Sequence, residues 1–137
     1  PAVKARLAEL NAGPFGRYSH AEKELSARFR RERPDDTAHW LEVAERSAAA
    51  GPPPRQPLAG PMTYAAIGAI GCPMLLITGE EDLYMPPEML REVAARHLPH
   101  ARVEIVPDAA HAVPLEQPDI FNRLLLGFLR GIGNDDA

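Results

Sequence analysis

The segment from Pro73 to Thr78 restricts the fold of this chain more than any other part of the sequence. It reads Pro-Met-Leu-Leu-Ile-Thr, a nearly continuous apolar run that Gly79 bounds on the far side. A strand that is apolar on both faces belongs inside a parallel sheet that helices cover on each side. We therefore expect a short strand here, within an α/β fold.

The sequence after this strand predicts a helix, a second strand and a final helix. Pro86 and Pro87 suit the first turn of a helix that Pro99 ends. Residues 102–106 alternate in polarity and are rich in β-branched side chains, which predicts the second strand. Two strands joined by one helix are parallel and form a right-handed crossover. The final helix, expected over residues 118–130, has an apolar face made of Ile120, Phe121, Leu124, Leu125, Phe128 and Leu129.

Residues 1–50 predict helices with thin apolar stripes. The segment 19–33 is rich in charged residues and predicts one exposed helix, which Pro34 ends. The polar residues 35–37 offer cap oxygens for a second helix over residues 38–50. Helices with so little apolar surface cannot enclose a core by themselves, so we expect them to lie on another part of the protein.

A proline-rich stretch separates two parts of different character. Residues 51–61 hold five prolines, so they can neither propagate a helix nor supply the donors of a sheet. We divide the chain there into a helical segment with its connector, residues 1–61, and a core segment, residues 62–137. The helical segment is expected to hold a further short helix over residues 3–10.

The composition argues against several classes of protein. The chain has 15 basic and 19 acidic residues, a net charge of −4, whereas nucleic-acid binding favours the opposite sign. No apolar run approaches the roughly 18 residues of a membrane helix. Because no charged-then-apolar leader opens the chain, we expect a cytoplasmic protein. Cys72 is the single cysteine, which excludes an internal disulfide, and we expect it to be buried and inert.

Two loops of the core segment carry side chains that can do chemistry together. Asp82 lies just after the first predicted strand, and His111 lies just after the second. Parallel neighbours lie about 4.8 Å apart and their carboxyl ends share one edge of the sheet, so the two side chains can come within hydrogen-bond distance. An aspartate that accepts the imidazole proton fixes the tautomer, and the free ring nitrogen can then act as a general base.

These loops resemble two loops of the α/β-hydrolase superfamily. Residues 79–86, GEEDLYMP, resemble its acid loop, and residues 110–118, AHAVPLEQP, resemble its histidine loop. The resemblance covers about residues 62–130 and implies the C-terminal portion of an α/β-hydrolase fold. Residues 1–50 are similar in composition and place to the helical lid that many members insert ahead of the acid strand.

The resemblance implies roles for individual residues. Asp82 would be the acid and His111 the base of a catalytic triad, with no metal and no organic cofactor. Read alone, Asp82 could be a solvated turn residue and His111 a structural histidine that bonds a loop carbonyl. The candidate substrate contacts are Tyr84, Met85, Val113 and Trp40, although for Trp40 we favour packing within the lid or core.

The third member of such a triad has no match in these 137 residues. The family order is nucleophile, acid and histidine, and the nucleophile lies in a Gly-x-Ser-x-Gly turn after a strand. The chain contains no such pentapeptide, and its serines before Asp82 lie in or beside polar segments. Two parallel strands are also too few for a stable sheet. We therefore expect an N-terminal hydrolase segment or a second chain to supply the nucleophile.

Two functions remain open at this point. The first is a hydrolase that acts on a small apolar ester, lactone or related acyl or carbon–carbon substrate, or on haloalkanes and epoxides if the nucleophile is aspartate. The second is a non-catalytic, truncated hydrolase-like binding module that self-associates through its bare sheet edge. The presence of both Asp82 and His111 favours the enzyme, because an idle scaffold has no use for the pair.

Overall fold

Two parallel strands lie between layers of helices in the computed structural model, which describes residues 13–49 and 63–134. Strand β1 (Met74–Gly79) pairs with β2 (Ala101–Val106) along its whole length, from Met74 beside Ala101 to Gly79 beside Val106. Helix α6 (Pro87–His97) joins the strands. The predicted strand–helix–strand unit and its parallel pairing are confirmed.

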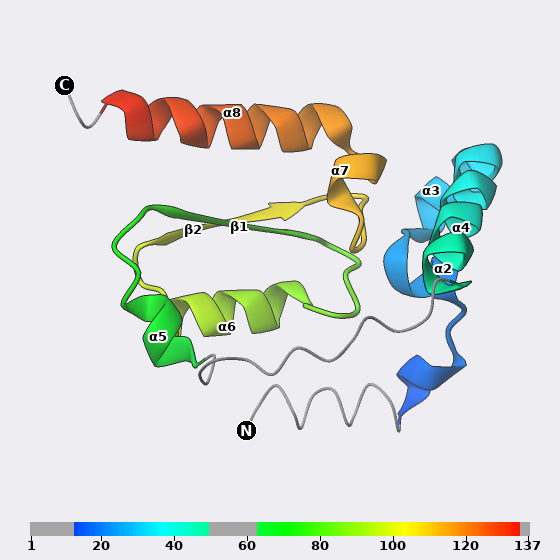
Figure 1. Ribbon diagram of the computed structural model, residues 1–137, viewed down its shortest axis with the longest axis horizontal. Coiled ribbons are helices and arrows are strands. Elements are labelled where there is room, and N and C mark those ends of the chain that lie inside the picture. The colour runs from blue at the N-terminus through cyan, green and yellow to red at the C-terminus, as the bar shows by residue number, and fades with distance from the viewer. Residues whose placement is uncertain (1–12, 50–62, 135–137) are drawn as a thin grey trace.

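The helices of the core segment lie on both faces of this strand pair. In Figure 1, α8 (Pro118–Asn134) runs along one face, and α6 with the short α5 (Tyr64–Gly68) lies on the other. A one-turn helix, α7 (Val113–Glu116), joins the loop after β2 to α8. The described part of the chain is thus a three-layer α/β arrangement.

The helices of residues 13–49 lie at the carboxyl ends of the strands, near α7 (Figure 1). They are η1 (Pro14–Arg17), α2 (His20–Glu24), α3 (Ala27–Glu32) and α4 (Pro34–Ala49). We call these residues the N-terminal helical segment. The helix predicted over residues 3–10 and the proline-rich stretch 51–61 lie outside the described residues.

Two expectations for this segment were wrong. The single helix predicted over 19–33 is broken at Leu25, whose backbone is extended with φ −121° and ψ 139°. Ser26 then begins a new helix, because its hydroxyl accepts a hydrogen bond from the Phe29 amide at 3.1 Å. Helix α3 does end just before Pro34, at Glu32, but α4 begins at Pro34 itself and not at residue 38, since proline fits the first turn of a helix.

The hydrophobic core lies beneath the carboxyl end of β2. Val106, Ala109 and Val113 are almost completely buried there, and side chains of β1 and α8 pack against them. Leu129 was expected on the buried face of α8 but is 52% exposed. A helix of 17 residues spans about 25 Å whereas six strand residues span about 20 Å, so the end of α8 extends past β2.

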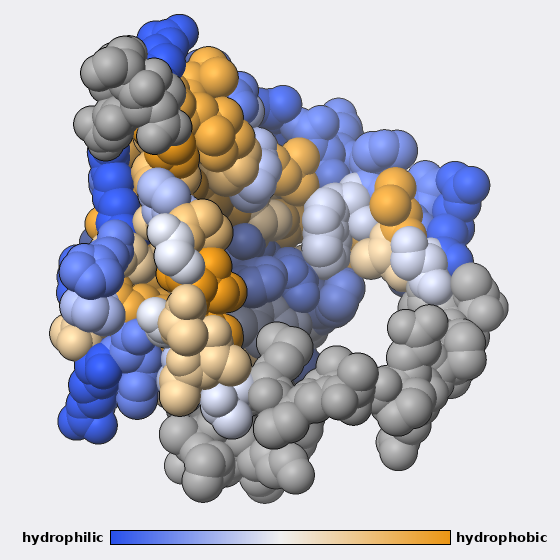
Figure 2. Space-filling view, turned by 60° about the vertical axis from the view of Figure 1, so that its left-hand side comes forward, coloured by the Kyte–Doolittle hydropathy of each residue, from blue (hydrophilic) through white to orange (hydrophobic). Residues whose placement is uncertain are grey.

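Apolar surface gathers on one face of the molecule. Figure 2 shows a band of hydrophobic side chains with hydrophilic ones on either side. Several large apolar side chains are exposed, including Ile70 before β1 and Leu126 on α8. Among the helices of residues 13–49 and 63–134, none is long and apolar enough to cross a membrane.

Candidate active site

Asp82 and His111 meet at the carboxyl end of the two strands, as the sequence predicts. Nδ1 of His111 lies 2.9 Å from Oδ2 of Asp82. The Asp82 side chain is 4% exposed, whereas the His111 side chain is 47% exposed. The carboxylate is therefore enclosed by protein, while the imidazole reaches the surface.

Three further donors surround the Asp82 carboxylate. The amides of Tyr84 and Met85 donate to Oδ1 at 2.8 and 3.0 Å, and the Thr78 hydroxyl, 2.8 Å from Oδ2, donates to that oxygen. Burial raises the pKa of Asp82, but the hydrogen bonds from Met85, His111 and Thr78 outweigh burial and hold this pKa below its usual range. Because the ionised carboxylate can only accept, the shared proton belongs to Nδ1 of His111.

Aromatic rings lie next to the His111 imidazole. The Tyr84 ring centroid is 4.7 Å from that of His111, and Phe15 meets Tyr84 edge-on at 5.1 Å. Burial, together with the neighbouring carboxylate of Glu24, raises the pKa of Tyr84 to about 12. The Tyr84 phenol therefore stays neutral near pH 7 and presents an apolar ring to the imidazole.

The loops after β1 and β2 are held directly against each other. The Glu80 amide donates to the Val106 carbonyl and the Glu81 amide to the Ala109 carbonyl, each at 2.9 Å. A Cβ on Gly79 would collide with the carbonyl oxygens of Ala109 and Ala110. Only glycine thus lets the two loops approach closely enough for Asp82 and His111 to bond.

The N-terminal helical segment contacts the same two loops. The Ala112 amide donates to the Glu24 carbonyl at 3.0 Å. Nη1 of Arg28 lies 2.7 Å from Oδ2 of Asp108, a residue that adopts a positive φ of 53°. These contacts tie residues before the proline-rich stretch to the loop that carries His111, so the segment forms one wall of the candidate site.

The other predicted site residues lie in different surroundings. Tyr84 faces His111, and Met85 supports Asp82 through its backbone amide. Val113 is 3% exposed in the hydrophobic core, so its side chain offers almost no surface to a substrate. Trp40 packs beside His20 with ring centroids 5.0 Å apart, which agrees with the packing interpretation.

Sequence reasoning missed several residues that support the site. Thr78 lies at the carboxyl end of the apolar run. A polar residue at that end of a buried strand, just before the acid loop, is a signal that could have identified it. Glu116 accepts amide hydrogen bonds from Ala110, which is close in the sequence, and from Ser26, which is distant, and the sequence carries no signal for either partner. Among the described residues, no group of three His, Cys, Asp or Glu side chains is arranged to hold a metal ion.

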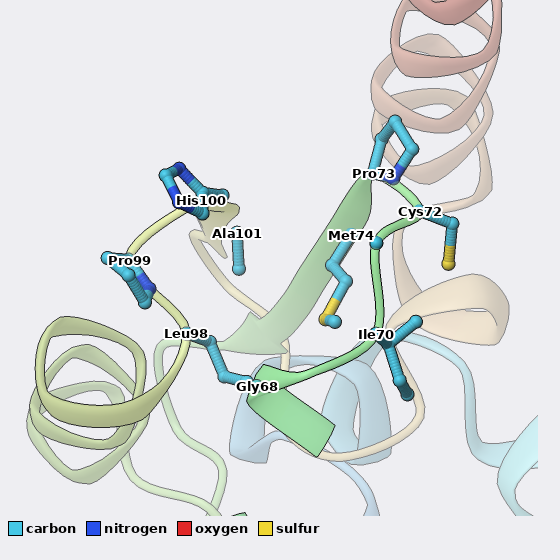
Figure 3. A pocket seen from close by; sticks show the side chains of 10 residues that line it. Gly68, Ile70, Cys72, Pro73, Met74, Leu98, Pro99, His100 and Ala101 are labelled. Carbon is cyan, nitrogen blue, oxygen red and sulfur yellow. The ribbon is translucent and has the colours of Figure 1, made fainter. Parts of the chain in front are cut away.

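A cavity of about 270 Å³ lies at the amino end of the two strands, away from Asp82 and His111. Figure 3 shows residues from the turn before β1, including Ile70 and Cys72, and from the turn before β2, including Pro99 and His100. Cys72 is exposed there, so the expectation that it is buried was wrong. The error arose because the sequence shows its apolar neighbours but not the opening of the cavity beside them. Its expected position, at the strand end away from Asp82, is correct.

Comparison with known proteins identifies the class of protein. The sequence pattern described as "Alpha/beta hydrolase family" matches residues 1–124. The chain therefore belongs to the alpha/beta hydrolase family, and its fold is a partial α/β-hydrolase fold.

Individual relatives carry several activities. The chain is 36% identical over 72 residues to "Putative 2-succinyl-6-hydroxy-2,4-cyclohexadiene-1-carboxylate synthase" of Bacillus subtilis (strain 168), covering 53% of this chain and 26% of that protein. It is 38% identical over 69 residues to carboxylesterase YbfK of the same strain, covering 50% and 23%. A solved structure titled "Est816 as an N-Acyl homoserine lactone degrading enzyme" matches with TM-score 0.55 and 28% identity, over 93% of this chain and 51% of that one. The matches with the two curated relatives span about a quarter of their length.

Proposed function

We propose that this chain supplies the acid and the base of a nucleophile–His–Asp hydrolase. The observation that carries the proposal is the 2.9 Å contact between His111 and a buried, ionised Asp82. A segment outside these 137 residues supplies the nucleophile, either from an N-terminal part of the same protein or from a second chain. We call this chain together with that segment the assembled protein.

The proposed reaction uses the two nitrogens of His111 differently. Nδ1 donates to Asp82, so Nε2 is available to take the proton of the nucleophile as that group attacks the substrate carbonyl. The resulting imidazolium is stabilised by Asp82 and then gives its proton to the leaving group. A water molecule then attacks the acyl carbon of the acyl-enzyme while His111 takes a proton from it. The bond between the acyl carbon and the nucleophile breaks, the acid product leaves, and His111 returns the proton to the nucleophile.

The proposed substrates are small apolar esters and lactones. Two relatives support this class, one named a carboxylesterase and one described as degrading an N-acyl homoserine lactone. The neutral Tyr84 ring and Phe15 beside it give the imidazole an apolar neighbour suited to such a substrate. In this proposal the N-terminal helical segment is the lid, and the enzyme works in the cytoplasm without nucleic acid, membrane or cofactor.

The test begins with the protein as isolated. Mass spectrometry under denaturing conditions shows whether a Gly-x-Ser-x-Gly segment accompanies this chain, and p-nitrophenyl butyrate reports ester hydrolysis. His111→Ala is expected to lower kcat by about 10³-fold or more, as losses of triad members do. The matched control is His100→Ala, because His100 is exposed and lines the cavity at the opposite edge.

Two results would contradict the proposal. Activity of His111→Ala within a few-fold of the parent protein would remove His111 from the reaction. A folded protein with no nucleophile-bearing segment and no esterase activity would instead support the non-catalytic binding module.

A further inference from the structure

Glu116 joins two parts of the chain that flank the candidate site. One of its carboxylate oxygens, Oε1, accepts from the Ala110 amide at 2.8 Å. The other, Oε2, accepts from the Ser26 amide at 2.7 Å. Ala110 and Ser26 are each 1% exposed, so neither amide has ready access to water as a replacement partner.

The backbone amides of the residues on either side of His111 are both hydrogen-bonded. Ala110, just before it, is held by Glu116, and Ala112, just after it, donates to the Glu24 carbonyl. Glu24 is the last residue of α2 and Ser26 caps the start of α3, so two residues at the junction of these helices take part in the two contacts. The backbone of His111 is therefore fixed from both sides.

We infer that Glu116 is a positioning residue that fixes His111 for proton transfer. Because Glu116 also binds the Ser26 amide, this positioning of His111 depends on docking of the N-terminal helical segment. The inference rests on the proposed function for the reaction that it serves. Glu116 acts through the Ala110 backbone: it sets the direction of the imidazole relative to Asp82 and to the position of the nucleophile. A misplacement of about 1 Å costs about 10²-fold in rate.

A carboxylate is required at this position because both of its partners are amide donors. Two acceptor oxygens can serve two N–H groups, whereas a glutamine side chain has one oxygen and an NH₂ group that only donates. Glu116→Gln therefore keeps the size of the side chain, preserves one contact and places a donor against a donor at the other. This variant therefore changes the hydrogen bonds of residue 116 without removing side-chain volume, as a truncation to alanine would.

The main experiment compares Glu116→Gln with Glu88→Gln in the protein as isolated. Glu88 is an exposed residue in the first turn of α6, so it is a matched control. Glu116→Gln is expected to lower kcat about 10- to 100-fold, with KM changed by no more than about twofold because Glu116 acts on His111 rather than on substrate. The proton NMR resonance of His111 Nδ1–H, shifted downfield by Asp82, is expected to broaden or disappear. Circular dichroism confirms that each variant is folded.

A second pair of variants tests the docking contact from the other side. Ser26 has φ −61°, which proline adopts, and Leu25 has the extended backbone that favours a following proline. Ser26→Pro removes both the amide that Glu116 binds and the hydroxyl, whereas Ser26→Ala removes only the hydroxyl, which caps α3 and lies 3.5 Å from the Asp108 carbonyl oxygen. We expect kcat to fall about tenfold more in Ser26→Pro than in Ser26→Ala. This pair also keeps the inference testable if Glu116→Gln does not fold.

The outcomes separate this inference from the proposed function. An active parent protein whose kcat and Nδ1–H resonance are unchanged by Glu116→Gln and by Ser26→Pro overturns the positioning role and leaves the hydrolase intact. If the parent protein has no esterase activity, the resonance still decides: its loss in folded Glu116→Gln supports positioning, and its persistence overturns it. An equal loss of kcat in Glu88→Gln would also overturn the inference.

Discussion

The two ends of the same strand pair are organised differently. At the carboxyl end, the loops after β1 and β2 hydrogen-bond each other, enclose Asp82 and contact the N-terminal helical segment. At the amino end, a cavity of about 270 Å³ lies between the turns that lead into the strands, and Cys72 is exposed beside it. The proposed catalytic pair, Asp82 and His111, thus lies at the end where backbone and side chains are held by many partners.

This difference bears on where in the molecule the proposed chemistry would take place. The cavity at the amino end has volume and a thiol, but its wall is mostly apolar. The carboxyl end has a buried carboxylate bonded to a half-exposed imidazole. The paired geometry, rather than the presence of a cavity, is therefore our reason for proposing that the chemistry takes place at the carboxyl end.

The largest expected effect compares the chemistry of the two ends. Asp82→Asn in the assembled protein is expected to lower kcat about 10⁴-fold, because an amide no longer fixes the His111 tautomer. Cys72→Ser is expected to leave kcat within about twofold, since Cys72 lies at the other end of β1. Hydrolysis of p-nitrophenyl butyrate measures both. A strong loss of kcat in Cys72→Ser would contradict the proposed site and indicate that the chemistry takes place at the amino end.

The next effect compares how tightly the two ends are packed. Gly79→Ala is expected to lower the free energy of unfolding by about 3 kcal/mol, because its methyl group would meet the carbonyls of Ala109 and Ala110. At the amino end, the methyl group of Gly71→Ala would meet nothing within 4 Å. This variant is expected to change the free energy of unfolding by less than about 0.5 kcal/mol. Urea unfolding of both variants provides the measurement. Equal changes in the free energy of unfolding would show that the two ends tolerate an added methyl group equally well.

The third prediction concerns acid. The pKa of Asp82 is lower in the folded protein than in the unfolded chain, where it lies near 3.9, so the unfolded chain binds more protons in acid. The stability that Asp82 contributes is fully present above about pH 5. It is lost as the pH falls from the pKa of Asp82 in the unfolded chain to its lower pKa in the folded protein. Asp82→Asn is expected to be less stable at neutral pH and to depend less on pH below about 5. Urea unfolding between neutral and acidic pH tests this, and identical slopes for parent and variant would contradict it.

The smallest expected effect concerns the rim of the carboxyl end. The Arg28 and Asp108 side chains are 49% and 53% exposed, so their ion pair is largely solvated. Arg28→Ala is expected to shift the urea midpoint less than Gly79→Ala or Asp82→Asn does, and about 1 M salt should remove the shift because screening then acts within about 3 Å. A large, salt-insensitive shift would show that the rim is as tightly coupled as the buried carboxylate.

The pairing of Asp82 with His111 could be predicted because it follows from two strong patterns. The apolar run before Gly79 fixes where β1 ends, and the alternating residues 102–106 fix where β2 ends. Parallel order then brings the following loops to one edge. Neither step depends on contacts between distant parts of the chain other than the strand pairing itself.

The features that the sequence did not reveal depend on local or distant hydrogen bonds. Ser26 interrupts the expected helix through one bond to the Phe29 amide, and the charged residues around it suit one helix or two. Glu116 meets the Ser26 amide across 90 positions, a contact that only the folded chain creates. Cys72 stands among apolar neighbours that gave no sign of its exposure.

The six-pair register of β1 and β2 also has a consequence for protein engineering. The turn that leads from α6 into β2 passes through Pro99 and His100, both exposed and at the far end of the strands from Asp82. Because the register is set along the strands themselves, a reporter peptide inserted between these residues would leave the geometry of the opposite edge unaltered. This turn is therefore the place in the described chain to attach a label.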